Sequence, residues 1–518
     1  MSLQTQLSVQ KLLDLYQAYI VPRLTQKNKT IGISTAVALS LVYFIRNRIL
    51  KPPKSLRRIP YIGYFTILGS FIRGESQWDF DHRVLFPMLE SKCKDGIYMK
   101  PTALGWTIFV TTPEHAKVVF LKTVMGRFVN GPNLVFLNGP HWKSQRKVAN
   151  PAFHRSMPVN LFGQLTLKLF DVIEKDGPKV DFSDLMQRWT LDAIGQAGFG
   201  FNFNALGDKD NDWVKTYNTI NEGSTSILYG VFPGLDNRNS FFLPPRRRTI
   251  HRELDRFLGM IDQVILKKRE QVAKGNLQND ALQENEKDLL TLMIESEQRG
   301  EGVLSDEELK SNVCIFFLAG HDTTANTLCV IVLYLALYPE MQQKAREEAF
   351  RVLGDEPRDI LPTLDQTKEL TYINQIMKEA LRIRGPAPRG IPRQVTEDIV
   401  LSDKPIPKNS LISVDLFGIH HNKRVWKDPE VFDPDRFDED NENNGPRPGM
   451  AWVPFSNGAR QCIGMNFSLY EQRVLLAMLL RKYIWTLPED SIHKHGIISQ
   501  GHGIVGPAQV NINFKKRF

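Results

Sequence analysis

The chain has 518 residues, 42% of them hydrophobic and 24% charged, which is the composition of an ordinary globular protein with a large core. Its four cysteines are scattered without CxxC spacing, which argues against a disulfide framework or a zinc site and indicates a reducing compartment. The net charge of +9 favours acidic partners or an anionic membrane surface, but the chain carries no zinc-finger or RNP-like pattern that would indicate nucleic-acid binding.

The first 60 residues are interpreted as a membrane anchor with its linker. Residues 1–29 carry apolar side chains at helical spacing, as an interfacial helix does. Residues 30–45 have no charge; this is shorter than the ~20 residues of a typical spanning helix, but snorkelling cations and a thin bilayer compensate. More cations follow this segment than precede it, which keeps the bulk of the protein cytosolic.

We therefore predict an amphipathic segment at 1–29, a single transmembrane anchor at 30–50 and a stiff proline-bearing linker at 51–60. A cleaved signal peptide and a buried core helix are the alternatives for the anchor. Residues 61–518 are predicted to form one large, mainly α-helical domain with small peripheral β-sheets. Strands are expected first, at 96–99 and 106–110.

Helical patterns dominate the middle of this domain. A short helix is expected at 113–121 and long helices up to about residue 390, with a polar loop at 275–287. Strand and loop signals return between 391 and 452, and again after 488. No internal repeat is visible, so a single domain remains the simplest interpretation.

The longest predicted helix opens with a capping box. Ser305 caps the helix, Glu308 reaches back to it, and no proline interrupts the pattern before Pro339. Within this helix, residues 319–324 (AGHDTT) combine small residues, an acid and two hydroxyls, which are poor helix formers. A hydroxyl that bonds back to the preceding turn can open a groove for a small ligand, so this stretch is a candidate functional site. The alternative is a packed helix whose Thr323 is satisfied by its own backbone.

A single cysteine stands in a glycine-bearing loop at residues 455–464 (FSNGARQCIG). A thiolate that ligates iron needs backbone N–H groups close to the sulfur, and Gly458 and Gly464 leave room for them. Arg460 could meet an anionic group beside the metal, whereas the alternative is a buried, inert Cys462. The pattern F-x-x-G-x-R-x-C-x-G resembles the haem-ligand loop of the cytochrome P450 family, in which this cysteine is the axial ligand of the haem iron.

The resemblance implies the cytochrome P450 fold and extends over roughly residues 60–515. Residues 319–324 resemble the oxygen-binding stretch of the family, which implies that Thr323 hydrogen-bonds the bound oxygen and that Asp322 takes part in proton delivery. His321 falls at the variable position of this stretch and is expected to line the pocket or face solvent. Both catalytic roles are carried over from the family's motif.

Two further motifs belong to the same resemblance. Residues 432–437 (FDPDRF) resemble F-x-P-E-R-F with Asp in place of Glu, which implies a buried structural network of Arg436 with Glu379 and Arg382. The remaining motif is W-x-x-x-R, whose two residues share one helix face. The resemblance implies that the haem is held by Trp142, Arg146, Arg393, Phe455, Arg460 and Cys462.

The function implied is that of a membrane-anchored, microsomal haem-thiolate monooxygenase. Its cofactor is expected to be haem b, with O₂ as co-substrate and electrons from NADPH through cytochrome P450 reductase, or from cytochrome b5. Lys143, Lys147 and Arg473 are expected to face the reductase, and the endoplasmic reticulum membrane is the expected location. The alternatives are an isomerase or dehydratase of oxygenated lipids on the same fold, and a haem protein that only binds ligands.

The substrate is predicted from two uncharged stretches expected to face the iron. These are residues 129–137 and the part of the long helix that bears Ile315, Phe316 and Ala319. An ionised ligand buried there would lack a partner, which is costly, whereas an apolar ligand gains ~25 cal/mol per Å² buried. We therefore expect a lipophilic substrate such as a steroid, a fatty acid or a hydrophobic xenobiotic.

Overall fold

The protein's structure, a computed structural model, describes residues 14, 16–20, 50–93, 95–102, 105–111, 123–125, 132–135, 137–224, 244–274, 287–300, 302, 304–438, 449–501 and 504–518. The predicted anchor, the short helix at 113–121, and most of the amphipathic segment and of the polar loop lie outside the described residues. One short helical turn, η1 (Tyr16–Ile20), belongs to the amphipathic segment.

Helices make up most of the described chain, as predicted. The α-helices are α3 (Tyr64–Ile72), α4 (Gln77–Phe80), α5 (Phe86–Ser91), α7 (Gly139–Arg155), α8 (Val159–Asp176), α9 (Phe182–Ala193), α10 (Asp212–Ser224), α12 (Pro245–Ala273), α14 (Leu289–Gln298), α15 (Asp306–Leu337), α16 (Pro339–Leu353), α17 (Leu364–Lys368), α18 (Thr371–Arg384), α19 (Leu416–His420) and α20 (Met465–Lys482). The short 3-10 and π turns are η3 (Lys54–Leu56), η4 (Asp81–Leu85), η5 (Ile194–Gly198), η8 (Pro434–Phe437) and η9 (Gly458–Arg460).

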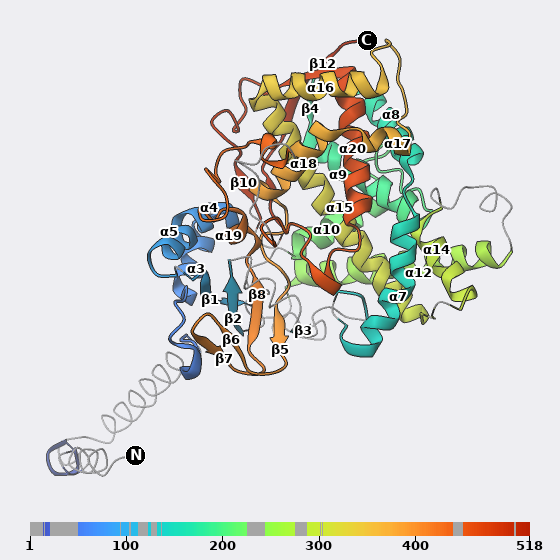
Figure 1. Cartoon of the computed structure of the whole chain (residues 1–518). Coiled ribbons are helices and arrows are strands. Elements are labelled where there is room, and N and C mark those ends of the chain that lie inside the picture. Colours follow the sequence, from blue (N-terminus) through green and yellow to red (C-terminus); the bar gives the residue numbers. More distant parts are fainter. Residues whose placement is uncertain are drawn as a thin grey trace.

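The strands are short and lie at the periphery. They are β1 (Ile97–Thr102), β2 (Gly105–Val110), β3 (Thr123–Met125), β4 (Lys179–Asp181), β5 (Arg393–Val395), β6 (Ile399–Leu401), β7 (Lys404–Ile406), β8 (Leu411–Val414), β9 (Tyr483–Thr486), β10 (Ser499–Gln500), β11 (Gly506–Pro507) and β12 (Asn511–Lys516). Figure 1 shows β1, β2, β5 and β8 gathered beside α3 to α5, away from the large helical body. The two strands predicted at 96–99 and 106–110 are confirmed as β1 and β2.

The largest sheet joins distant parts of the chain. Its strand order is β1-β2-β8-β5-β3, and β2 pairs in parallel with β8, with Thr107 opposite Leu411. A three-stranded sheet, β4-β12-β9, places Asn511 near the C-terminus opposite Asp181. Both sheets therefore hold C-terminal segments against the first half of the chain.

Helix α15 is the element around which the other helices pack. The predicted capping box is present: the Glu308 N–H donates to Ser305 Oγ at 3.2 Å, and the Ser305 N–H donates to Glu308 Oε2 at 2.8 Å. The helix ends at Leu337, and Pro339 opens α16. Along its length α15 contacts α9, α12, α16, α18 and α20.

The burial of α15 explains its apolar character. Among the described residues it is the single helix long and apolar enough to cross a membrane by length and composition. Because 67% of its most apolar window is buried by the rest of the protein, α15 is a core helix. Polar residues within this apolar helix, such as His321 and Asp322, therefore need a reason to be there.

Candidate active site

The loop before Cys462 is turned by two residues in the left-handed region. Ser456 has φ 61° and Gly458 has φ 73°, and the Cys462 N–H closes the loop by donating to the Phe455 carbonyl oxygen at 2.9 Å. The positive φ at position 458 therefore favours glycine there. At Gly464 an added Cβ would approach nothing in the chain closer than 3.7 Å, so the packing within the chain does not require glycine there.

Cys462 is exposed in the described chain. Burial raises the pKa of the thiol, while a hydrogen bond from the Gly464 N–H to the sulfur and the charge of Arg146 oppose that rise. The surrounding protein thus desolvates the thiol although part of its surface is accessible. A donor and a cation thus stand ready to stabilise a thiolate.

Four side chains near the loop form what we call the arginine cradle: Trp142, Arg146, Arg393 and Arg460. The Arg460 guanidinium lies 3.9 Å from the centroid of the Trp142 ring, and Arg146 Nη2 donates to the Gln461 carbonyl oxygen at 3.1 Å. No cradle arginine forms an ion pair with a carboxylate of the described chain. Three cations are therefore gathered without an anion from the described part of the chain.

The cradle also contains donors that no described residue satisfies. Trp142 Nε1 and Arg393 Nη1 are buried and have no hydrogen-bond partner among the described residues. Burial, followed by the charges of Arg393 and Arg146, lowers the pKa of Arg460 to about 9, and burial lowers the pKa of Arg393 to about 10. Both observations fit an anionic ligand with several acceptor oxygens, such as the two propionates of haem.

The stretch at 319–324 lies in the middle of α15. Leu318 and Ala319 keep accessible surface in this otherwise mostly buried helix. Thr323 Oγ1 donates back to the Ala319 carbonyl oxygen at 2.6 Å, whereas Thr324 Oγ1 lies 2.9 Å from Ser468 Oγ on α20. Thr323 is therefore the hydroxyl on the accessible side, and Thr324 joins two helices.

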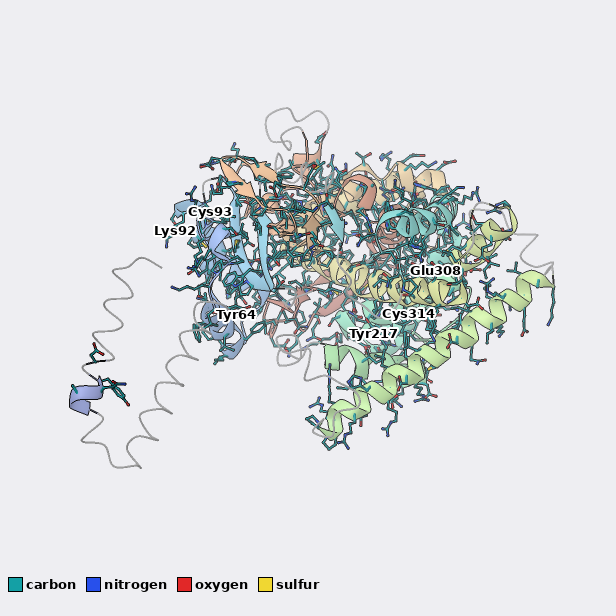
Figure 2. The ribbon with its side chains drawn as sticks, turned by 90° about the horizontal axis from the view of Figure 1, so that it is seen from below. Tyr64, Lys92, Cys93, Tyr217, Glu308 and Cys314 are labelled. Carbon is teal, nitrogen blue, oxygen red and sulfur yellow. The ribbon has the colours of Figure 1, made fainter. Side chains whose placement is uncertain are left out.

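Asp322 has a partner that the sequence does not reveal. Tyr217, on α10, donates its hydroxyl to Asp322 Oδ2 at 2.6 Å. Figure 2 shows Tyr217 between α15, which carries Glu308 and Cys314, and the long helix α12. The expectation that His321 lines the pocket or faces solvent is wrong, because His321 is 2% exposed and its ring packs edge-on against Tyr217 at 4.8 Å.

The predicted pocket residues do not all behave alike. Ile315 is half-buried and Ala319 is accessible, but Phe316 is buried against the Phe153 ring at 5.0 Å. Much of the segment at 129–137 lies outside the described residues. Its described part is fixed to α15, because the Leu134 N–H donates to Asn312 Oδ1 at 2.9 Å.

A second buried group, which we call the rear network, consists of Glu379, Arg382 and Arg436. Arg382 donates to both Glu379 oxygens at 2.7 and 2.8 Å, and its Nη1 donates to the His420 carbonyl oxygen at 2.8 Å. Arg436 Nε lies 3.4 Å from Glu379 Oε1. Trp452 Nε1 donates to the Lys378 carbonyl oxygen at 3.0 Å and so links α18, the helix of Glu379 and Arg382, to the segment before Cys462. The predicted structural network is therefore present.

Comparisons with known proteins agree on one family. The family model described as Cytochrome P450 matches residues 107–505. The Homo sapiens protein Cytochrome P450 4F8 is 31% identical over 379 residues, which cover 71% of each chain. The Sus scrofa protein Taurochenodeoxycholic 6 alpha-hydroxylase is 30% identical over 397 residues, covering 73% of this chain and 76% of the relative.

A solved structure agrees with the fold. The haem domain of a cytochrome P450DA mutant superposes with a TM-score of 0.71 at 23% sequence identity. The superposition covers 84% of this chain and 93% of that domain. The predicted mainly helical fold with small peripheral sheets is confirmed.

Proposed function

The chain belongs to the cytochrome P450 family, and from that premise we propose that it inserts one oxygen atom of O₂ into a lipophilic substrate, with Cys462 as the residue that would ligate the haem iron. As a family member it is an oxidoreductase of the monooxygenase type. It uses haem b, with O₂ as co-substrate and NADPH as the source of electrons. Bound haem supplies a thiolate-ligated iron that activates O₂.

The residues of the chain have distinct parts in this proposal. The Gly464 N–H and Arg146 favour the thiolate form of Cys462, and the Phe455 carbonyl holds the loop closed. The arginine cradle would bind the haem propionates. Thr323 already donates its proton to the Ala319 carbonyl oxygen, so its lone pairs remain available to accept a hydrogen bond, and Asp322 is the neighbouring proton carrier.

The observation that carries this proposal is the arginine cradle beside the Cys462 loop. Three buried or half-buried guanidinium groups without a carboxylate are costly in a folded protein unless an anion joins them. The indole N–H of Trp142 and Arg393 Nη1 supply unfilled donors in the same group. A cysteine thiol with an accessible face next to such a group is the arrangement that haem with its two carboxylates would complete.

The test is the absorption spectrum of the reduced, carbon-monoxide-bound protein. The wild-type protein should show the Soret band of a thiolate complex, and Cys462→Ser should lose it. Cys314→Ser and Cys329→Ser are matched controls, because burial raises the pKa of each thiol, to about 11 for Cys314, and keeps it protonated. Persistence of the thiolate band in Cys462→Ser would end the assignment.

For the substrate we propose a large lipophilic molecule such as a steroid, a fatty acid or a hydrophobic xenobiotic. The accessible side of α15 near Ala319 is apolar and includes Leu318 and Ile315. One relative is named as a Taurochenodeoxycholic 6 alpha-hydroxylase, which supports a lipid-like substrate. Titration of the ferric protein with steroids and long-chain lipids should shift the Soret band; a panel in which only small charged metabolites shift it would contradict the proposal.

For electron transfer we propose docking of an acidic reductase, with cytochrome b5 as a second donor, near the exposed Lys143 and Lys147 of α7. Arg473 is a poorer candidate, because it is half-buried and donates to Asn374 Oδ1 at 2.8 Å. Charge-steered docking weakens as the Debye length shrinks to ~3 Å at 1 M salt. The rate of reduction should therefore fall with salt, and Lys143→Glu with Lys147→Glu should weaken that dependence.

For the location we propose the endoplasmic reticulum membrane. Residues 1–29 would form an amphipathic segment, residues 30–50 would span the membrane and residues 51–60 would be a linker. The domain of residues 61–518 would then face the cytosol. Just after the linker, Tyr61, Phe65, Leu68 and Ile72 are 40%, 73%, 49% and 78% exposed. The spacing of Phe65, Leu68 and Ile72 places them along one face of α3, with Tyr61 just before the helix, which suits contact with lipid. Deletion of residues 1–50 should release part of the protein from membranes, and adding Phe65→Ser and Ile72→Ser should release more.

A further inference from the structure

His321 and Asp322 form a close pair inside the protein. They are 2% and 8% exposed, and His321 Nδ1 lies 3.2 Å from Asp322 Oδ1. Neither atom has a hydrogen-bond partner among the described residues, so their contact is a close approach and not an aligned hydrogen bond. A nitrogen lone pair this close to a carboxylate oxygen is costly unless the ring carries a positive charge.

The other ring nitrogen determines how many protons the imidazole carries. His321 Nε2 lies 2.8 Å from the carbonyl oxygen of Gln187 on α9. A carbonyl oxygen only accepts, so Nε2 must carry a hydrogen. A neutral ring would then present the lone pair of Nδ1 to the Asp322 carboxylate. The contact is attractive only if the pair holds one further proton.

The hydrogen bond from Tyr217 indicates where this proton resides. The Tyr217 hydroxyl donates to Asp322 Oδ2. Burial and the charge of Asp322 raise the pKa of Tyr217 above its ordinary value, so the hydroxyl keeps its proton and remains the donor. Burial alone would raise the pKa of Asp322, but the interactions with His321, Tyr217 and the Gln187 side chain outweigh it and lower that pKa. Because Asp322 Oδ2 already accepts the hydrogen bond from Tyr217, the further proton is placed on the imidazole.

We propose that His321 is a positioning residue that keeps one proton on the His321–Asp322 pair, as an imidazolium beside a carboxylate, directly before Thr323. The inference rests on the proposed function, in which Asp322 passes protons toward the O₂ site. It differs from the role implied by the family resemblance, because the stored proton belongs to the histidine. Asp322 then transfers that proton, and the pair regains one from water between turnovers.

The surroundings of His321 contain few groups that would compete. Tyr217 on α10 and Asp322 on α15 are the titratable residues with described contacts to it, and α9 contributes the Gln187 carbonyl. Arg188, next in sequence on α9, is paired with Asp184 at 2.8 Å. The Phe317 ring lies 6.3 Å from the imidazole and carries no charge.

His493 is a matched control elsewhere in the chain. Its Nε2 lies 2.6 Å from the Ala508 carbonyl oxygen, as in His321, but its Nδ1 accepts a hydrogen bond from the Ile498 N–H at 3.1 Å. One hydrogen therefore satisfies both contacts, and burial lowers the pKa of His493. The two buried histidines should differ by one proton.

The first experiment measures that proton directly, without turnover. The full-length protein is labelled with ¹⁵N-histidine and studied by NMR as its reduced carbon-monoxide complex, which is diamagnetic. Spectra of His321→Gln and His493→Gln assign the two residues. At neutral pH we expect both ring nitrogens of His321 to be protonated and one of His493; a neutral His321 with unprotonated Nδ1 would overturn the inference.

The second experiment measures the use of electrons. His321→Phe keeps a ring against Tyr217, and His321→Gln keeps an N–H donor, but neither side chain holds an extra proton. With the lipid that gives the largest Soret shift, product per NADPH should fall at least about fivefold in both variants, with hydrogen peroxide rising and the haem spectrum unchanged. His493→Gln should keep the wild-type ratio.

The outcomes separate the two proposals. Absence of the thiolate band or of oxygenated product in the wild type would defeat the proposed function. An active wild type whose product ratio is unchanged in both His321 variants would defeat the inference alone. If His321→Phe fails to incorporate haem, the Gln variant and the wild-type NMR spectrum decide the question.

Discussion

The rear network and the arginine cradle are two sets of charged residues that differ in how completely the chain satisfies them. In the rear network, all three guanidinium nitrogens of Arg382 donate, and both Glu379 oxygens accept. In the cradle, Arg393 Nη1 and Trp142 Nε1 have no partner in the described chain. Arg436 Nε in the rear network also lacks a hydrogen-bond partner in the described chain, but it lies 3.4 Å from the Glu379 carboxylate, so its charge is paired. The charge-paired network holds elements in place, whereas the cations of the cradle, which have no carboxylate in the described chain, indicate a ligand. Unfilled donors are thus evidence for a site where the cations beside them are also unpaired.

The largest effect should follow from opening the rear network. Arg382→Met would leave the Glu379 carboxylate buried without its main partner, which costs ~3–5 kcal/mol for a buried pair. We expect the variant to lose most of its folded, haem-containing protein, as measured by thermal unfolding and haem content. Lys368→Met is the control: it removes a pair of the same i, i+3 spacing, with Asp365 at 2.8 Å, on the surface, and should leave unfolding unchanged.

A smaller effect is expected from the cradle. Arg393→Met removes a cation that has no carboxylate partner, so we expect haem to dissociate about tenfold faster, a change of ~1.4 kcal/mol in binding. Because bound haem stabilises the folded state, added haem should restore any lost stability. Haem transfer to an acceptor protein measures the rate. If excess haem rescues Arg382→Met equally well, the distinction between the two groups fails.

The last effect varies with pH and concerns Glu471 on α20, a buried acid without a cation in the described chain. It is 2% exposed, its Oε1 has no partner in the described chain, and burial raises its pKa well above 4.5. The contribution of the raised Glu471 pKa to the free energy of unfolding is complete below the unfolded-state pKa. It is lost as the pH rises toward the folded-state pKa. The loss amounts to ~1.4 kcal/mol for each pH unit that separates the two pKa values.

Glu471→Gln should remove this loss. As pH rises above about pH 5, unfolding of the wild type should become easier relative to the variant. Thermal unfolding across this range measures the difference. Parallel curves for the two proteins would show that Glu471 has a partner that keeps its pKa ordinary.

Sequence predicted best what depends on neighbours along the chain. The Ser305 capping box and the pairing of Glu379 with Arg382 each span three residues, so the spacing fixes the contact once the helix forms. The motif at 432–437 added Arg436. Membership of the family then ordered these pieces into one fold.

Contacts between distant segments could not be predicted in this way. Tyr217 meets Asp322 across 105 positions, and the Gln187 carbonyl meets His321 across 134, with no local pattern for either. The burial of His321 depends on these partners, so no local pattern could have predicted it. Arg473 was expected at the surface because helix position alone does not reveal that Asn374 accepts its hydrogen bond.

The parallel pairing of β2 with β8 sets an order on biosynthesis. Thr107 can pair only once Leu411, about 300 positions later in the chain, has been made. At ~5–20 residues per second, a ribosome needs roughly 15–60 s to go from residue 107 to residue 411. During that time β2 pairs with β1 alone and its other edge stays open to unwanted partners. Nascent chains should therefore depend on chaperones until β8 emerges, and slowing translation upstream of residue 411 should increase aggregation of the newly made protein.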